Sequence, residues 1–289
     1  MSNEVATHVA RGIEAIGQDD LETATSALVA AREAGGADDG RVLHLAGLVG
    51  WLGGSLDEAA SNLLKAVEAA PANAMIQLDA AEFLFVEGEL EEAEAILRDF
   101  LDREAEEEGR DDARMLLAQL RLEDDDAEEA LEVLDTVEAS KDRVEYFVSR
   151  GGVLFALGRH DESIEMLTQA AEREPDDADL QYQLAVVLHA ANRREESSAR
   201  MLKVLELDGA HRSGAGSAID SDVQRDLRER FEAILEEVPE PVMKRLAGAP
   251  IHVEAAPTPA QVREGLDPRN AVAFLGTAAG GEGEGTLER

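Results

Sequence analysis

The sequence predicts a mostly α-helical protein: an α-solenoid of about six helical hairpins, followed by a small, incomplete α/β unit. Ala, Leu and Glu dominate the chain and aromatic residues make up only 3% of it, a composition that favours closely packed helices over strands. Small residues also recur at intervals of about 34, which indicates a repeated hairpin. We expect the repeats over residues 1–209, a linker over 210–223 and the partial α/β unit over 224–289.

The repeat is carried by a small residue in the second helix of each hairpin. In five copies this residue is Ala59, Ala93, Ala130, Ser163 or Ser197, at intervals of 34, 37, 33 and 34 residues. An earlier copy with Ala24 makes six copies in all. A small side chain there lets the two helix backbones approach each other. Gly54, Gly88 and Gly158 fit the turns between the helices, where glycine permits a left-handed backbone. Pro71 and Pro175 end helices because proline lacks the amide hydrogen.

The spacing in the second copy closely resembles that of the tetratricopeptide repeat family. The residues that carry the resemblance are Gly54, Leu56, Ala59, Leu63, Ala66 and Pro71. The resemblance implies that the first helix of each hairpin lines a concave surface, and that the protein acts as a scaffold that binds another polypeptide there. The fourth copy departs from the pattern, with Asp125 in place of the turn glycine and extra residues before it.

One column of side chains is the candidate binding surface. Counting twelve positions into each hairpin gives a mostly large, apolar series, which we call the column: Ile16, Trp51, Phe85, Leu122, Phe155 and His189. One interpretation is that these side chains fill gaps between neighbouring helices. The other is that they are exposed anchors for an amphipathic helix or an extended segment. The sequence leaves both open.

Other lining positions exclude a clamp for acidic peptides. Such a clamp needs Lys, Arg and Asn along the first helices, but the second copy offers Arg41, His44 and Leu48 at these positions. His44 and Leu48 therefore join the column in the predicted groove. We expect the groove to bind a protein or peptide, an apolar or basic helix, and not an acidic C-terminus.

The net charge of the chain further limits the classes of partner that it can bind. The formal net charge is −36, which argues against nucleic acid and against anionic membranes. The sequence contains no cysteine, no signal-peptide pattern and no apolar run long enough to span a membrane, and we expect a cytoplasmic location.

The last eighty residues break the period. We expect a helix over 224–247 with Leu227, Phe231 and Leu235 on one face, a strand over 250–257, a short helix from Thr258, and a turn at Gly265 and Pro268. A Gly-rich segment, GTAAGGEGEG, follows.

This order resembles the opening of a small bacterial zincin-like metallopeptidase domain, over roughly residues 224–276. The family holds zinc on an HExxH helix, but that motif is absent from this chain, and none of its six histidines has a partner four residues on. We therefore assign no catalytic residue, no metal ligand and no cofactor. The alternative function is a repeat-fused zinc metallopeptidase, represented by a chain that stops before its active-site helix.

Overall fold

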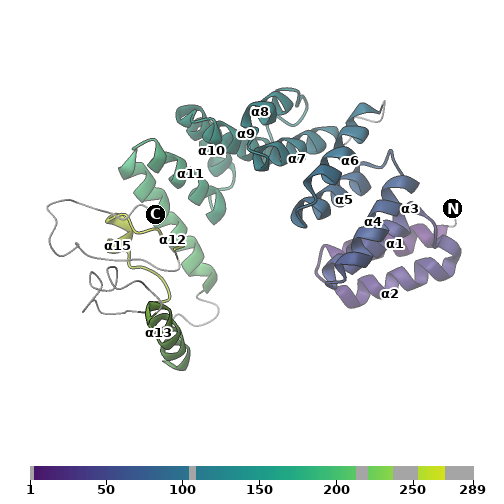
Figure 1. The fold of residues 1–289 in the computed structure, drawn as a ribbon, viewed down its shortest axis with the longest axis horizontal. Helices are drawn as coiled ribbons and strands as arrows, with labels where there is room; N and C mark the ends of the chain where they lie inside the picture. Colours follow the sequence, from purple (N-terminus) through teal and green to yellow (C-terminus); the bar gives the residue numbers. More distant parts are fainter. Residues whose placement is uncertain (1–2, 104–108, 213–220, 237–252, 271–289) are drawn as a thin grey trace. The chain divides into compact units, whose positions relative to one another are not determined.

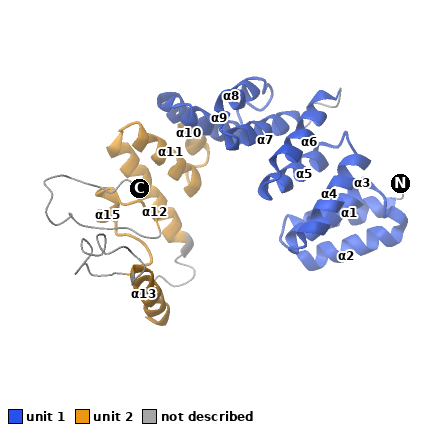
Figure 2. Cartoon of the chain, viewed as in Figure 1, with its two compact units in different colours: residues 1–166 blue, residues 167–289 orange. Residues whose placement is uncertain are grey.

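The computed structural model describes residues 3–103, 109–212, 221–236 and 253–270, and most of them are helical (Figure 1). The chain separates into two compact units, Met1–Met166 and Leu167–Arg289 (Figure 2). The division falls inside one helix, His160–Arg173. The domain boundary expected near residue 209 stays a prediction.

Six pairs of consecutive helices form the hairpins. Their bounds are α1 Asn3–Ile16 and α2 Leu21–Ala31, α3 Gly40–Leu52 and α4 Leu56–Ala69, α5 Ala74–Val86 and α6 Leu90–Asp102, α7 Arg110–Glu123 and α8 Ala127–Asp135, α9 Val144–Ala156 and α10 His160–Arg173, α11 Ala178–Ala190 and α12 Arg194–Arg212. A short π-helical turn, Arg32–Gly36, ends the first hairpin. The predicted hairpins are therefore present in the structure.

Short acidic or amide side chains start several of these helices. Asp20, Asn73 and Asp126 each accept a hydrogen bond from the backbone amide three residues on. Such a bond satisfies one of the amides that a helix start leaves without a partner. The helix starts are thus encoded locally, by residues that the sequence displays directly.

The small residue of each second helix lies in the core, as the repeat predicts. Ala24, Ala59, Ala93 and Ala130 have no exposed surface, and Ser163 and Ser197 are also buried. The two serine hydroxyls donate to the carbonyls of Gly151 and Ala185, each twelve residues earlier on the first helix of the same hairpin, at 2.7 and 2.8 Å. Serine is tolerated because this bond satisfies its buried hydroxyl.

The two helices of the second hairpin approach so closely that the first helix has no room for a larger side chain at Gly47 or Gly50. A methyl group added to Gly47 would lie 2.5 Å from Leu63 Cγ, and one added to Gly50 would lie 3.1 Å from the backbone nitrogen of Ala59. Within the first unit each hairpin also packs on the next, through contacts of α1 with α3, α3 with α5, α5 with α7 and α7 with α9. The first helices therefore form a continuous row in this unit.

Among its described residues, the second unit continues past α12 with the helices α13 Ser221–Glu236 and α15 Pro259–Arg263. The helix expected from Thr258 is confirmed, and Thr258 and Gln261 form a capping box at its start. The turn at Gly265 is confirmed too, with φ of +103°. The part of the predicted helix beyond residue 236, His252 and the Gly-rich segment lie outside the described residues.

The strand expected over 250–257 is wrong for residues 253–257, the part that the structure describes. These residues form no strand, and the carbonyl of Val253 accepts a hydrogen bond from the Gln224 side chain on α13, at 2.7 Å. A strand requires a neighbouring strand to pair its backbone, and the described residues contain no strand. The predicted small α/β unit is not supported.

Candidate polypeptide-binding surface

The column has the same place in every hairpin. Three positions after each column residue stands a residue with positive φ: Asp19, Gly54, Gly88, Asp125, Gly158 and Asn192, with φ between 55° and 83°. The amide of that residue donates to the carbonyl of the column residue in all six hairpins, at 2.9 to 3.2 Å. The column therefore occupies the last turn of each first helix, next to the hairpin turn.

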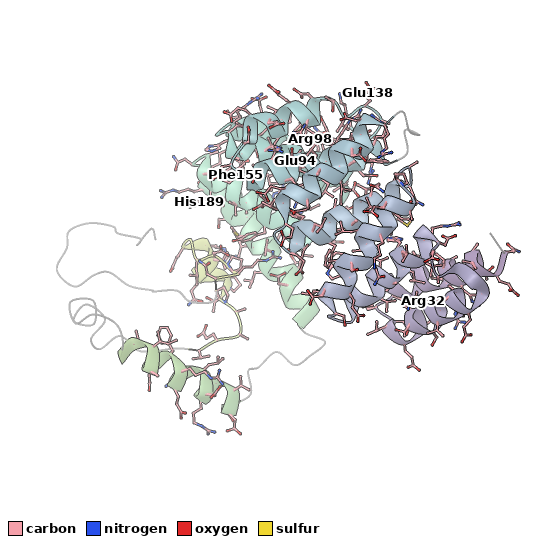
Figure 3. All side chains as sticks on the ribbon, turned by 45° about the vertical axis from the view of Figure 1, so that its right-hand side comes forward. Arg32, Glu94, Arg98, Glu138, Phe155 and His189 are labelled. Atoms are coloured by element: carbon pink, nitrogen blue, oxygen red, sulfur yellow. The ribbon has the colours of Figure 1, made fainter. Side chains whose placement is uncertain are left out.

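The side chains of the column differ in exposure along the chain. The five apolar members are half-buried, and His189 is exposed. Figure 3 labels Phe155 and His189. Trp51 packs edge-on against Phe83 of the next hairpin, with ring centroids 5.3 Å apart and an interplanar angle of 85°. Phe155 lies against the ring of His160 across its own hairpin turn, at 5.6 Å. Each apolar member thus contacts protein on one side and leaves part of its surface open.

This half-buried state bears on both interpretations of the column. Trp51 and Phe85 pack at the edge of the core that includes Phe83 and Leu97, and Ile16 packs at the edge of the core around Leu45. The side chains therefore do fill space between hairpins. Their open surface remains available to a ligand, and the role of the column in binding stays a prediction.

His44 and Leu48, which the sequence assigned to the groove, are buried, with 2% and 7% of their surface exposed. His44 Nε2 lies 2.7 Å from Asp79 Oδ2, a hydrogen bond that joins α3 to α5 of the next hairpin. His44 thus joins neighbouring hairpins. The prediction that these two side chains line the groove is corrected because both are buried and leave little surface for a ligand.

The neighbours of the column on α5 are acidic. Glu82 stands three residues before Phe85, on the same side of the helix, and burial together with the charge of Asp79 raises the pKa of the Glu82 carboxyl above its usual range. A cation placed beside Glu82 would stabilise its carboxylate and lower this pKa again. Arg41, the cation among the predicted lining positions, binds the carboxylate of Asp39 through its guanidinium, at 3.2 and 3.3 Å. The surface near Phe85 therefore suits a basic ligand.

A network of ion pairs ties the third hairpin to the fourth, where the sequence contains extra residues. Arg98 contacts Glu94 on its own helix (Figure 3) and Glu129 on α8, and Arg121 of α7 contacts both carboxylates as well. These groups hold α6, α7 and α8 together around a shared set of charges. Their role is structural, since each cation is already paired.

The described residues contain neither a cluster of metal-ligating side chains nor a membrane-spanning helix. Across residues 3–103, 109–212, 221–236 and 253–270, no group of three or more His, Asp or Glu side chains is arranged to hold a metal ion. Within the same ranges, no helix combines the length and the apolar character needed to cross a bilayer.

Comparison with protein families identifies the repeats. Residues 53–196 match a model described as a tetratricopeptide repeat-like domain, and residues 9–74 match one described as a tetratricopeptide repeat. Residues 9–196 are tetratricopeptide repeats. Comparison with curated proteins finds no match.

Solved structures with the same fold include PilF, PilW and a further tetratricopeptide repeat protein. A structure of PilF from Pseudomonas aeruginosa is 14% identical over 71% of this chain and 91% of its own, with a TM-score of 0.61. PilW, a widely conserved type IV pilus biogenesis factor, is 13% identical over 78% of this chain and all of its own, with a TM-score of 0.62. A tetratricopeptide repeat protein from Parabacteroides merdae is 17% identical over 85% and 98%, with a TM-score of 0.56. At these identities the likeness concerns the fold alone.

Three polar residues of the first helices take part in tertiary contacts that the sequence did not predict: Asp79, Asp179 and Tyr182. Asp79 lies 35 residues after His44, one position beyond the repeat equivalent Leu78, so the period gave no signal for it. Asp179 and Tyr182 occupy the second and fifth positions of α11, the positions that Arg41 and His44 hold in the second hairpin. For Asp179 and Tyr182 the repeat period was the available signal, since the same positions repeat from hairpin to hairpin.

Proposed function

We propose that this tetratricopeptide repeat protein is an interaction scaffold that binds an apolar or basic helix of a partner polypeptide along the column. The observation that carries the proposal is that one position, fixed by the same backbone hydrogen bond in every hairpin, holds a half-buried apolar side chain in five of six copies. Apolar side chains with one open face, set at a regular spacing, are typical anchors for an amphipathic helix.

The charge of the surface supports a basic partner over an acidic one. The chain has a net charge of −36, and Asp79 and Glu82 lie on the helix that carries Phe85. A helix with Lys or Arg beside its apolar face would associate faster and pair with these carboxylates. Nucleic acids and anionic membranes would be repelled, and we propose neither as a partner.

Trp51 provides a direct readout, because it is the chain's only tryptophan. The probe is a synthetic amphipathic helix of Leu and Lys without tryptophan, titrated into the full chain while Trp51 fluorescence is followed. We expect saturable binding that shifts the emission, and about ten-fold weaker binding after Phe85→Ala, since a truncated interface anchor costs roughly 1–2 kcal/mol. Phe155→Ala should weaken binding as well.

Leu64→Ala is the matched control for Phe85→Ala. Leu64 is an exposed apolar residue, 41% accessible, on the second helix α4 and outside the column. Circular dichroism should show unchanged helicity in all variants. Equal losses from Phe85→Ala and Leu64→Ala, or equal binding of a Leu/Glu helix of the same length, would contradict the proposal.

The metallopeptidase alternative depends on an HExxH helix that this sequence does not contain. It predicts that the genomic reading frame continues past Arg289 into a helix with HExxH, which would bring zinc. A stop codon after Arg289 would remove it, and one zinc per chain found by metal analysis after dialysis would argue against a purely binding role.

A further inference from the structure

The last described segment of the chain, residues 253–270, lies on the final hairpin of the second unit. Its helix α15 contacts α12, and Val262 of this helix is buried, with 1% of its surface exposed. The segment has no repeat pattern of its own. It is therefore a non-repeat segment that packs on the last hairpin.

The segment is anchored by one arginine. The Arg269 guanidinium donates through Nε and Nη2 to both carboxylate oxygens of Asp208, at 3.1 Å each, and through Nη1 to Asp179, at 2.6 Å. Its centre also lies 5.0 Å from the centroid of the Tyr182 ring. A two-pronged carboxylate contact, a second carboxylate and an aromatic face together match the planar shape and the charge of a guanidinium.

The turn before Arg269 fixes its direction. Asp267 accepts a hydrogen bond from the Arg269 amide at one carboxylate oxygen and from the Tyr182 hydroxyl at the other, both at 2.8 Å. Burial and the bond to Asp267 raise the pKa of the Tyr182 hydroxyl, so this donor stays protonated at neutral pH. Tyr182 thus contacts the segment twice, with its hydroxyl and with its ring.

Two of the three residues that contact Arg269 stand at the positions that Arg41 and His44 hold in the second hairpin. Asp179 and Tyr182 hold the second and fifth positions of the first helix α11, and Asp208 comes from α12. In the second hairpin the fifth position belongs to His44, which is buried against the next hairpin. The segment therefore covers a side of the last hairpin that a following hairpin would otherwise cover.

We propose that Asp179, Tyr182 and Asp208 form an arginine-binding site on the last hairpin, that Arg269 is its built-in ligand, and that an arginine-bearing segment of a partner polypeptide displaces Arg269 from it. The site is separate from the column, and this proposal stands without the function proposed above.

The contacts of Arg269 are accessible enough for another arginine to replace it. Asp179 is 77% exposed and Arg269 is 29% exposed, so water and salt compete for this pair. The core contact of α15 is small, with Val262 as its buried residue. What favours the built-in ligand is its covalent link to the site, because a linked segment has an effective concentration that a free peptide must match.

The test uses the full chain and a fluorescent synthetic peptide with the sequence of residues 255–270, followed by fluorescence anisotropy. Arg269→Ala empties the arginine site, and we expect this variant to bind the peptide at least about ten-fold more tightly than the natural chain, which must release its own segment first. Adding Asp208→Ala to Arg269→Ala should abolish binding. A peptide with alanine in place of its arginine at the 269 position should not bind.

Arg263→Ala is the matched control for Arg269→Ala. Arg263 belongs to the same segment and is exposed, and its guanidinium hydrogen bond goes to Pro259 within its own helix. This variant should behave as the natural chain does. Equal affinity of the Arg269→Ala and Arg263→Ala chains for the peptide, or no binding to either, would overturn the proposal.

Hydrogen exchange separates a displaceable ligand from a fixed structural cap. Excess peptide added to the natural chain should speed amide exchange over residues 259–266 and leave α11 and α12 protected. If Arg269→Ala instead unprotects α11 and α12, or leaves residues 259–266 as protected as before, the segment is a structural part of the hairpin and the proposal fails. Neither readout depends on Trp51 or Phe155, so the two proposals can fail separately.

Discussion

Replacing Asp111 by alanine tests how the irregular fourth hairpin is joined to the fifth. Asp111 stands in the first turn of α7, and its carboxylate accepts hydrogen bonds from the backbone amides of Glu138 (Figure 3), Ala139 and Ser140, at 2.9 to 3.3 Å. It also pairs with Arg114, at 2.8 Å. One side chain thus holds the connection between α8 and α9.

The expected loss of stability follows from these bonds. An intramolecular hydrogen bond contributes about 1 kcal/mol net, and somewhat more when the acceptor is charged. Three amides and one guanidinium lose their acceptor in Asp111→Ala, but water can reach the exposed residues Glu138 and Ala139. We therefore expect a loss of about 2 kcal/mol, measured by urea unfolding followed by circular dichroism, with faster amide exchange at residues 138–140.

Asp112→Ala is the control, because Asp112 lies in the same first turn of α7 and experiences the same helix dipole. Its ion pair with Arg143 joins two side chains that are 39% and 41% exposed, and its loss should cost no more than about 0.5 kcal/mol. Equal urea midpoints for the two variants would refute the assigned role of Asp111.

The pH dependence of the same variant has a definite sign. Burial of the Asp111 carboxyl opposes ionisation, but the bonds from Arg114 and the three amides outweigh burial and lower its pKa below the ordinary value of 3.8. A lowered pKa means that the contribution is present above 3.8 and is lost as the pH falls through the folded-state pKa. The stability difference between the natural chain and Asp111→Ala should therefore persist from neutral pH to mildly acidic pH and shrink below 3.8.

Two further predictions concern the hairpin turns and the ligand. Asp125 and Gly88 occupy equivalent turn positions with φ of 59° and 83°. In urea unfolding, Asp125→Gly should therefore stabilise the chain by up to about 1 kcal/mol, and Gly88→Ala should destabilise it by about 1 kcal/mol. A loss of stability from Asp125→Gly would show that the Asp125 side chain matters more than its backbone conformation. An acidic C-terminal peptide titrated into the chain in calorimetry should give no heat of binding, because Arg41 is paired with Asp39; tight binding would reveal a clamp that the lining residues do not suggest.

The helical hairpins could be predicted because their determinants are local. Ala59 and its equivalents are buried where the period places them, and Thr258 starts a helix where its capping pattern indicates one. The left-handed turn residues were predicted only where they are glycine. Asp19, Asp125 and Asn192 adopt the same conformation because a short polar side chain tolerates it, a weaker signal that the period alone could have revealed.

The binding surface was less predictable because exposure depends on packing between hairpins. His44 has the position of a lining residue, yet its side chain is buried against Asp79 of the next hairpin. The column residues keep one backbone position in every hairpin, but whether these half-buried side chains bind a ligand stays a prediction. The alternation in residues 250–257 suggested a strand, and no second strand pairs with residues 253–257 in the described part of the chain.

The sequence by itself determined the repeat, the hairpin turns and the acidic character, because each depends on residues a few positions apart or on composition alone. The tertiary structure decided which faces of the hairpins are covered and by what. Arg269 meets Asp179 ninety positions earlier in the chain, and no local pattern encodes such a pairing. It arises because the path of the chain after α12 returns its last described residues to the first helix of the final hairpin, where two carboxylates and an aromatic ring fit a guanidinium.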